Sequence, residues 1–107
     1  MLRDGYFARY GETEYRASPD GATVRLYTPA MITVPASAVE LYYLRTVCTW
    51  RGQPFIVIGE HGPWLRVEYT GGRAPVAREL ELEEFDFGVY QAWVLRTEVV
   101  GLYEKRV

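Results

Sequence analysis

Polar and apolar residues alternate along much of the chain, in short runs that end at glycine-containing turns. The clearest run is WLRVEY, in which Leu65, Val67 and Tyr69 occupy alternate positions. Because the side chains of a β-strand point to opposite faces in turn, this period of two predicts a strand with these three residues facing a core. The intervening side chains are expected on the other face: Trp64, Arg66 and Glu68. The pattern predicts a mainly β protein.

A first repeat links the segment near residue 11 to a segment 41 positions later. Each copy has a turn glycine, an extended arm, a second turn (SPDG in one, GEHG in the other) and an arm with alternating apolar residues. The matched pairs are Gly11 with Gly52, Gly21 with Gly62, and Arg25 with Arg66. Glycine turns between alternating arms indicate two β-hairpins of the same design.

A second repeat joins VPASAVELYY, residues 34–43, to VLRTEVVGLY, residues 94–103, at an offset of 60. Both copies have the form V-x-x-[ST]-x-V-x-x-x-Y. We expect the hydroxyl residue, Ser37 or Thr97, to lie in a tight turn, where it can bond a free backbone N–H. The flanking valines and Tyr103 are expected in a core.

The two offsets differ by 19 residues, which indicates an insertion in the second unit. The segment GGRAPVARELELEEFDFG, at about 71–88, accounts for nearly all of it. Pro75 suits a first helical turn, and Val76 and Leu80 lie four residues apart, so a short helix over about 75–82 is predicted. The alternation in LELEEF is also compatible with a strand.

The segment WVLRTEV followed by VGLYEKR resembles the end of SH3-like and Tudor-like barrels, where a strand leads through a one-turn helix to a final strand; VPASAV followed by ELYYLR resembles it less closely. The resemblance and the repeat imply two abbreviated SH3-like units, residues 5–45 and 46–107, packed as one compact domain of 1–107. Two barrels packed together and one pseudo-symmetric β structure both fit this pattern.

Composition narrows the possible partners. A chain of 107 residues fits one compact domain, and its aromatic content of 15%, with nine Tyr, is high. The formal charge of −2 argues against binding through nucleic-acid phosphates, which requires many Lys and Arg side chains.

The single cysteine, Cys48, lies in an apolar run and is predicted to be buried. Without an export signal or a long apolar segment, we expect a cytoplasmic protein with no membrane contact.

No catalytic or cofactor-binding pattern is recognisable. His61 is the only histidine and lies in the turn GEHGP, and although Glu60 is its neighbour, adjacent turn residues usually diverge. Ser18 and Ser37 lack the glycines of a nucleophile elbow. One His and one Cys make no zinc spacing, and no glycine-rich phosphate loop is present. We expect neither an enzyme nor a metal, cofactor or small-molecule substrate.

The inserted segment carries the strongest functional signal. Its carboxylates could be a solvated face, but they precede the aromatic-rich run FDFGVYQAW on the one segment that interrupts the repeat. Charge that steers encounter, beside rings that supply affinity, is typical of a protein-binding surface for a basic partner. The predicted partner-binding residues are Glu79, Glu81, Glu83, Glu84, Asp86, Phe87, Tyr90 and Trp93.

An alternative surface involves matched arginines on the two hairpins. Arginine beside an aromatic ring is a common arrangement for holding single-stranded nucleic acid. The residues of this alternative face are Arg25, Tyr27, Trp64 and Arg66. The acidic balance of the chain makes nucleic acid the less favoured partner.

The opening DGYFARYGETEYRASPDGATVRLYTP and the closing FDFGVYQAWVLRTEVVGLYEKR together resemble small bacterial proteins found beside secreted polymorphic toxins and thought to act as immunity proteins. The resemblance implies a cytoplasmic, non-enzymatic protein that binds one cognate toxin and blocks its active cleft. Such a cleft, built for an anionic substrate, would be basic.

Overall fold

The computed structural model describes residues 2–107, which divide into two compact units. The N-terminal unit comprises Arg3–Arg45 together with Arg106–Val107, and the C-terminal unit comprises Thr46–Lys105 together with Leu2. Strand β5 (Glu40–Trp50) contributes residues to both. Each unit has its own buried apolar clusters.

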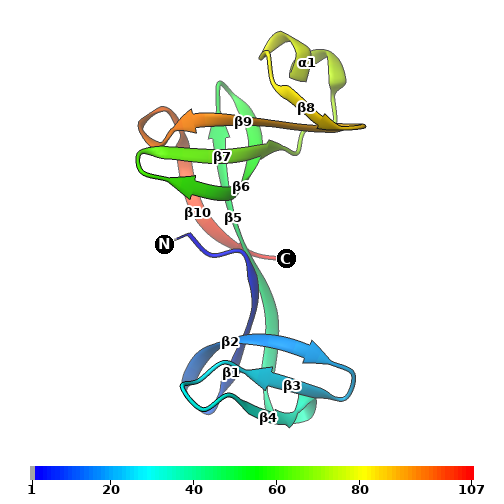
Figure 1. Ribbon diagram of the computed structural model, residues 1–107, viewed down its shortest axis with the longest axis vertical. Helices are drawn as coiled ribbons and strands as arrows, with labels where there is room; N and C mark the ends of the chain where they lie inside the picture. Colours follow the sequence, from blue (N-terminus) through cyan, green and yellow to red (C-terminus); the bar gives the residue numbers. More distant parts are fainter. Residues whose placement is uncertain (1) are drawn as a thin grey trace. The chain divides into compact units, whose positions relative to one another are not determined.

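The N-terminal unit is built from antiparallel strands in the order β4-β3-β2-β1-β5 (Figure 1). Its elements before β5 are β1 (Gly5–Tyr10), β2 (Thr13–Asp20), β3 (Thr23–Leu26), β4 (Ile32–Pro35) and the 3₁₀ helix η1 (Ala36–Ala38). Gly11 and Gly21, in the turns that flank β2, have φ of 63° and 62°, a conformation that glycine adopts without steric cost.

Strand β1 buries a side chain on each of its faces. Ala8 packs into a cluster completed by Ala17, Val24, Leu26 and Val34. Phe7, on the opposite face, is buried with Tyr42 and Leu44. The guanidinium groups of Arg3 and Arg16 lie 4.6 and 5.1 Å from the centre of the Phe7 ring, and long arginine side chains thereby cover this second cluster.

The C-terminal unit has the strand order β5-β6-β7-β9-β8, and β10 pairs with β5 (Figure 1). Its further elements are β6 (Gln53–His61), β7 (Trp64–Tyr69), α1 (Ala74–Glu79), β8 (Glu83–Asp86), β9 (Val89–Leu95), the 3₁₀ helix η2 (Arg96–Glu98) and β10 (Val100–Arg106). The main cluster comprises Cys48, Trp50, Phe55, Val57, Leu65, Val67, Tyr69, Ala77 and Val94.

The structure confirms a mainly β, antiparallel fold with one short helix. The predicted facing of β7 is also confirmed, since Leu65, Val67 and Tyr69 are buried whereas Trp64 is 41% exposed. Cys48 is buried as expected. The helix ends earlier than predicted, because Glu81 has a left-handed φ of 58° and the N–H of Leu82 turns back to the carbonyl of Ala77.

The prediction that Tyr103 lies in the core is wrong, because its side chain is 57% exposed. In β10 it is the neighbouring Leu102 that packs against the main cluster. Adjacent strand residues point to opposite faces, so Tyr103 points away from the core. The valines behave unequally: Val94 is buried and Val99 packs against the core, whereas Val100 is 64% exposed.

Candidate functional site

The segment predicted as an insertion is anchored to the core of the C-terminal unit. Pro75 lies in the first turn of α1, where its missing N–H leaves no hydrogen bond unmade. Ala77 is completely buried, and Val76, Leu80 and Leu82 pack against the main cluster. The β8–β9 hairpin therefore follows a segment that is packed against the core. Strand β8 is an edge strand of the sheet.

The five predicted carboxylates do not share one surface. Glu83 pairs with Gln91 across the hairpin and Glu84 pairs with Tyr90, so these two successive side chains point to opposite faces. All five carboxylates are exposed: Glu79, Glu81, Glu83, Glu84 and Asp86. The anionic character of the segment is therefore divided between two faces of the β8–β9 hairpin.

One face, here called the tryptophan face, consists of Trp64, Arg66, Glu83, Gln91 and Trp93. The Nε of Arg66 donates to Oε1 of Gln91 at 3.2 Å, and its Nη2 donates to Oε2 of Glu83 at 3.2 Å. The same guanidinium lies 5.6 Å from the centre of the Trp93 ring. Arg66 is thus held in place beside Trp93, and its charge is compensated by Glu83.

The two tryptophans remain open to solvent. Trp64 is 41% exposed and Trp93 is 51% exposed, and together with His61 they line a shallow groove of about 200 Å³. His61 pairs with Trp64 at the end of the β6–β7 hairpin, which brings the imidazole to this face. A groove of two indoles and an imidazole offers contact area for apolar or aromatic groups of a partner.

The β8–β9 hairpin ends in two exposed phenylalanines. Phe87 is 97% exposed and Phe85 is 66% exposed, Phe85 lying at the register shift between Glu84 and Asp86. Oδ1 of Asp86 accepts a hydrogen bond of 2.7 Å from the backbone N–H of Phe87, which helps to define the turn. Exposed rings of this size at a charged tip mark a contact surface.

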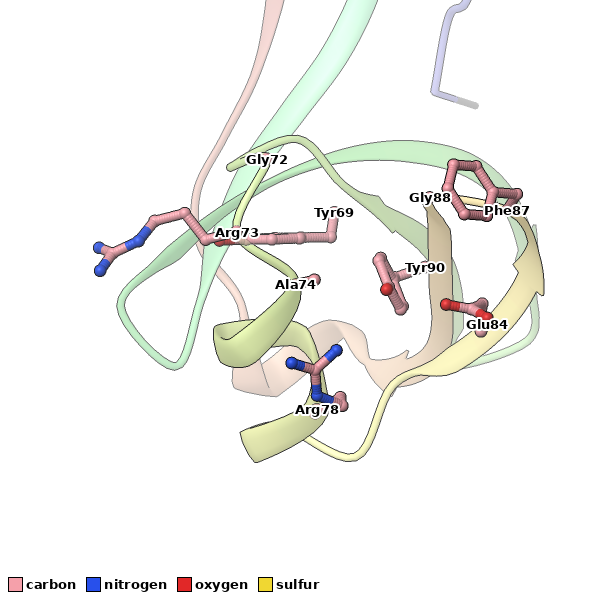
Figure 2. A pocket seen from close by; sticks show the side chains of 9 residues that line it. All are labelled: Tyr69, Gly72, Arg73, Ala74, Arg78, Glu84, Phe87, Gly88 and Tyr90. Carbon is pink, nitrogen blue, oxygen red and sulfur yellow. The ribbon is translucent and has the colours of Figure 1, made fainter.

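The opposite face of the hairpin forms a hollow of about 390 Å³ together with α1, here called the α1 hollow. Its lining comprises Tyr69, Gly72, Arg73, Ala74, Arg78, Glu84, Phe87, Gly88 and Tyr90 (Figure 2). Figure 2 shows the side chains of Arg78 and Glu84 extending toward Tyr90, whereas the guanidinium of Arg73 points away. A hydrogen bond to the Glu84 carboxylate raises the pKa of the Tyr90 hydroxyl, and the positive charge of Arg78 opposes this shift.

The alternative nucleic-acid residues fall into different units. Arg25 and Tyr27 belong to the N-terminal unit, and Trp64 and Arg66 to the C-terminal unit. Nη2 of Arg25 lies 3.4 Å from Oδ2 of Asp20, and the Tyr27 hydroxyl is hydrogen-bonded to Oγ of Ser18 at 2.8 Å. Like Arg66, Arg25 is therefore paired with a carboxylate, which partly neutralises the positive charge that would attract a phosphate.

Groups suited to other chemistry are sparse in the part of the chain that the structure describes. Within residues 2–107, no three His, Cys, Asp or Glu side chains are grouped so as to hold a metal ion. Burial raises the pKa of the Cys48 thiol, which disfavours the reactive thiolate. No helix in residues 2–107 has the length and apolar character needed to cross a membrane.

Sequence reasoning identified Trp64 and Trp93 but assigned them to different surfaces, and it did not identify Phe85, Arg78 or the α1 hollow. The run FDF already indicated that Phe85 accompanies Phe87. The hollow had no comparable signal, because it depends on how α1 packs beside the β8–β9 hairpin. Comparisons with family models, curated proteins and solved structures find no match to this chain.

Proposed function

We propose that this protein is a non-enzymatic protein-binding module that uses the tryptophan face and the tip of the β8–β9 hairpin. The observation that carries the proposal is the exposure of four large aromatic side chains on β7 and the β8–β9 hairpin: Trp64, Phe85, Phe87 and Trp93. When a partner covers such rings, a large apolar area is removed from water at a small cost in side-chain entropy. Aromatic side chains of this kind dominate the binding energy of many interfaces.

The charge around these rings indicates the kind of partner. Carboxylates project from both faces of the hairpin, and the one arginine on the tryptophan face is compensated by Glu83. A basic protein surface would be steered toward this region and would avoid like-charge repulsion. The specific form that we propose is an immunity protein that acts in the cytoplasm and covers the basic active cleft of a cognate toxin.

We further infer that the scaffold consists of two abbreviated SH3-like units related by an internal repeat. Both units contain, in order, three strands that form successive hairpins, a fourth strand, a 3₁₀ helix and a closing strand. Gly11 and Gly52 adopt positive φ at one hairpin turn, and Gly21 and Gly62 at the next. Helix α1 and β8 stand between the third and fourth strands of the second unit, where the sequence offset placed the insertion.

The alternative, a domain that binds nucleic acid or the translation and transcription machinery through Arg25 and Arg66, has less support. Each of these arginines already has a carboxylate partner. Titration with single-stranded oligonucleotides at low and moderate salt distinguishes the two functions. Phosphate-driven binding weakens steeply as salt rises, with a slope set by the number of phosphates contacted.

The test is binding to the product of the adjacent gene, measured by calorimetry with purified proteins. Alanine at both Trp64 and Trp93, or serine at both Phe85 and Phe87, is expected to weaken binding at least about 30-fold, as for loss of hot-spot residues. Tyr103→Ser is the matched control, because Tyr103 is also exposed but lies in β10. Absence of micromolar binding, or an equal loss in the control, would contradict the proposal.

A further inference from the structure

The α1 hollow is a second candidate site, separate from the tryptophan face. It lies on the opposite face of the β8–β9 hairpin, with α1 as one side and the hairpin as the other (Figure 2). Its volume of about 390 Å³ lies within the range of small-molecule sites. The hollow is therefore large enough to hold a small ligand. The chemistry of its lining residues determines which class of ligand it can bind.

Arg78 supplies an uncommitted positive charge to this hollow. Its guanidinium forms no ion pair or hydrogen bond with any of residues 2–107, whereas Arg25, Arg66 and Arg106 are each paired with a carboxylate. The planar guanidinium carries five donors in a fork that matches the two oxygens of a carboxylate. An arginine directed into a hollow without a protein partner is suited to bind an anion.

The remaining lining specifies what carries the anion. The rings of Tyr69, Phe87 and Tyr90 provide apolar surface beside Arg78. Glu84 lies across the hollow and disfavours a second negative charge on the ligand. We propose that the α1 hollow is a binding site for a monocarboxylate on an aromatic or aliphatic body, with Arg78 holding the carboxylate and the aromatic rings contacting the body.

Such a carboxylate has two possible sources, a free organic acid or the C-terminal residue of a peptide chain. Both present a carboxylate to Arg78. They differ in whether a peptide chain is attached to the apolar body. The hollow shares Phe87 with the tip of the hairpin, but none of its lining residues belongs to the tryptophan face. The double tryptophan variant is therefore expected to retain it.

The experiment is an amide NMR titration of the full chain with 3-phenylpropionate, its neutral amide and phenethylamine. We expect saturable shifts confined to residues near 69–90 for the acid alone, with a Kd of about 1–10 mM, as its size allows. Acetyl-glycyl-phenylalanine and its C-terminal amide form the second arm. Tighter binding of the free-acid peptide than of 3-phenylpropionate identifies a chain terminus as the source, and equal or weaker binding identifies a free acid.

Two arginine variants provide the matched comparison. Arg78→Gln is expected to raise the Kd at least about tenfold, because it removes a charged bidentate donor. Arg96→Gln is expected to leave the Kd unchanged, because Arg96 lies in η2 and is not among the residues that line the hollow. Equal loss in both variants, equal binding of the neutral amide, or no saturable shift with any probe would overturn the assignment.

Discussion

Gly71 is required by the close approach of a side chain. The phenol of Tyr69 lies against it, so that a Cβ at position 71 would stand 2.2 Å from the Tyr69 Oη and 2.4 Å from its Cζ. Tyr69 is buried, and its hydroxyl donates to Oε1 of Gln53 at 3.4 Å. The ring therefore cannot move aside without disturbing both the main cluster and the wall of the α1 hollow.

We predict that Gly71→Ala lowers the free energy of unfolding of the C-terminal unit by about 1–3 kcal/mol, as is usual when a packed site is overfilled. Urea unfolding followed by tryptophan fluorescence measures this, because the three tryptophans, Trp50, Trp64 and Trp93, all belong to that unit. Gly59→Ala is the control, since its Cβ would stand at an ordinary 3.6 Å from Cβ of Arg66. Equal losses in both variants would contradict the explanation.

At the scale of elements, Glu14 and Tyr42 join two strands that flank β1. Glu14 lies on β2 and Tyr42 on β5, and the Tyr42 hydroxyl donates a hydrogen bond to the Glu14 carboxylate over the intervening strand. This bond, with a second from Arg3, lowers the pKa of Glu14. Burial raises the pKa of Tyr42, and the same hydrogen bond raises it further.

These pKa shifts predict a defined pH dependence. A lowered pKa in the folded state means that Glu14 stabilises the N-terminal unit above its ordinary pKa of 4.5, and that this contribution is lost as the pH falls through the folded value. Glu14→Gln is expected to cost about 1 kcal/mol at pH 7, as for a partly exposed charged hydrogen bond, and progressively less as the pH falls below 4.5. Denaturation followed by NMR signals of residues 5–45 measures the cost at each pH.

Glu12→Gln serves as the control for that measurement. Glu12 lies exposed in the turn between β1 and β2, so its replacement removes the same charge without the hydrogen bond to Tyr42. A cost for Glu14→Gln that does not decrease as the pH falls below 4.5, or a cost of the same size for Glu12→Gln at pH 7, would contradict the assigned role.

The sequence predicted elements best where local periodicity alone decides them. The alternation of Leu65, Val67 and Tyr69 specified both the strand and its buried face. The segment predicted as an insertion was harder to assign, because LELEEF fits either a strand or a helix and the outcome depends on what packs against it. The division of Glu83 and Glu84 between two faces required knowledge of their pairing with β9, which no local pattern contains.

At the scale of the whole molecule, the two ends of the chain are shared between the units. Leu2 belongs to the C-terminal unit, where its N–H donates to Oε1 of Glu60 at 3.1 Å. Arg106 and Val107 belong to the N-terminal unit, although the strand that leads to them, β10, lies mostly in the other. The predicted repeat gave no indication that the chain ends would be assigned in this way, because the repeat describes only the hairpins and not the path of the two ends.

Removal of residues 106–107 is expected to destabilise the N-terminal unit selectively. The truncation deletes the hydrogen bond of 2.7 Å from Arg106 to Oε1 of Glu40 and the contact of its guanidinium 3.8 Å from the centre of the Tyr42 ring. It also deletes the 3.0 Å hydrogen bond from the N–H of Val107 to the carbonyl of Tyr43. These three contacts involve residues of the N-terminal unit alone.

We therefore predict that thermal unfolding of the truncated chain begins at a lower temperature for NMR signals of residues 5–45, while the transition reported by tryptophan fluorescence stays unchanged. The separation is expected because each unit buries its own apolar clusters. Lys105→Ala, which changes an exposed charge of the C-terminal unit, is the control and should shift neither signal. If both signals moved together in the truncated chain, the units would unfold as one cooperative structure, and the selective role of Arg106 would be disproved.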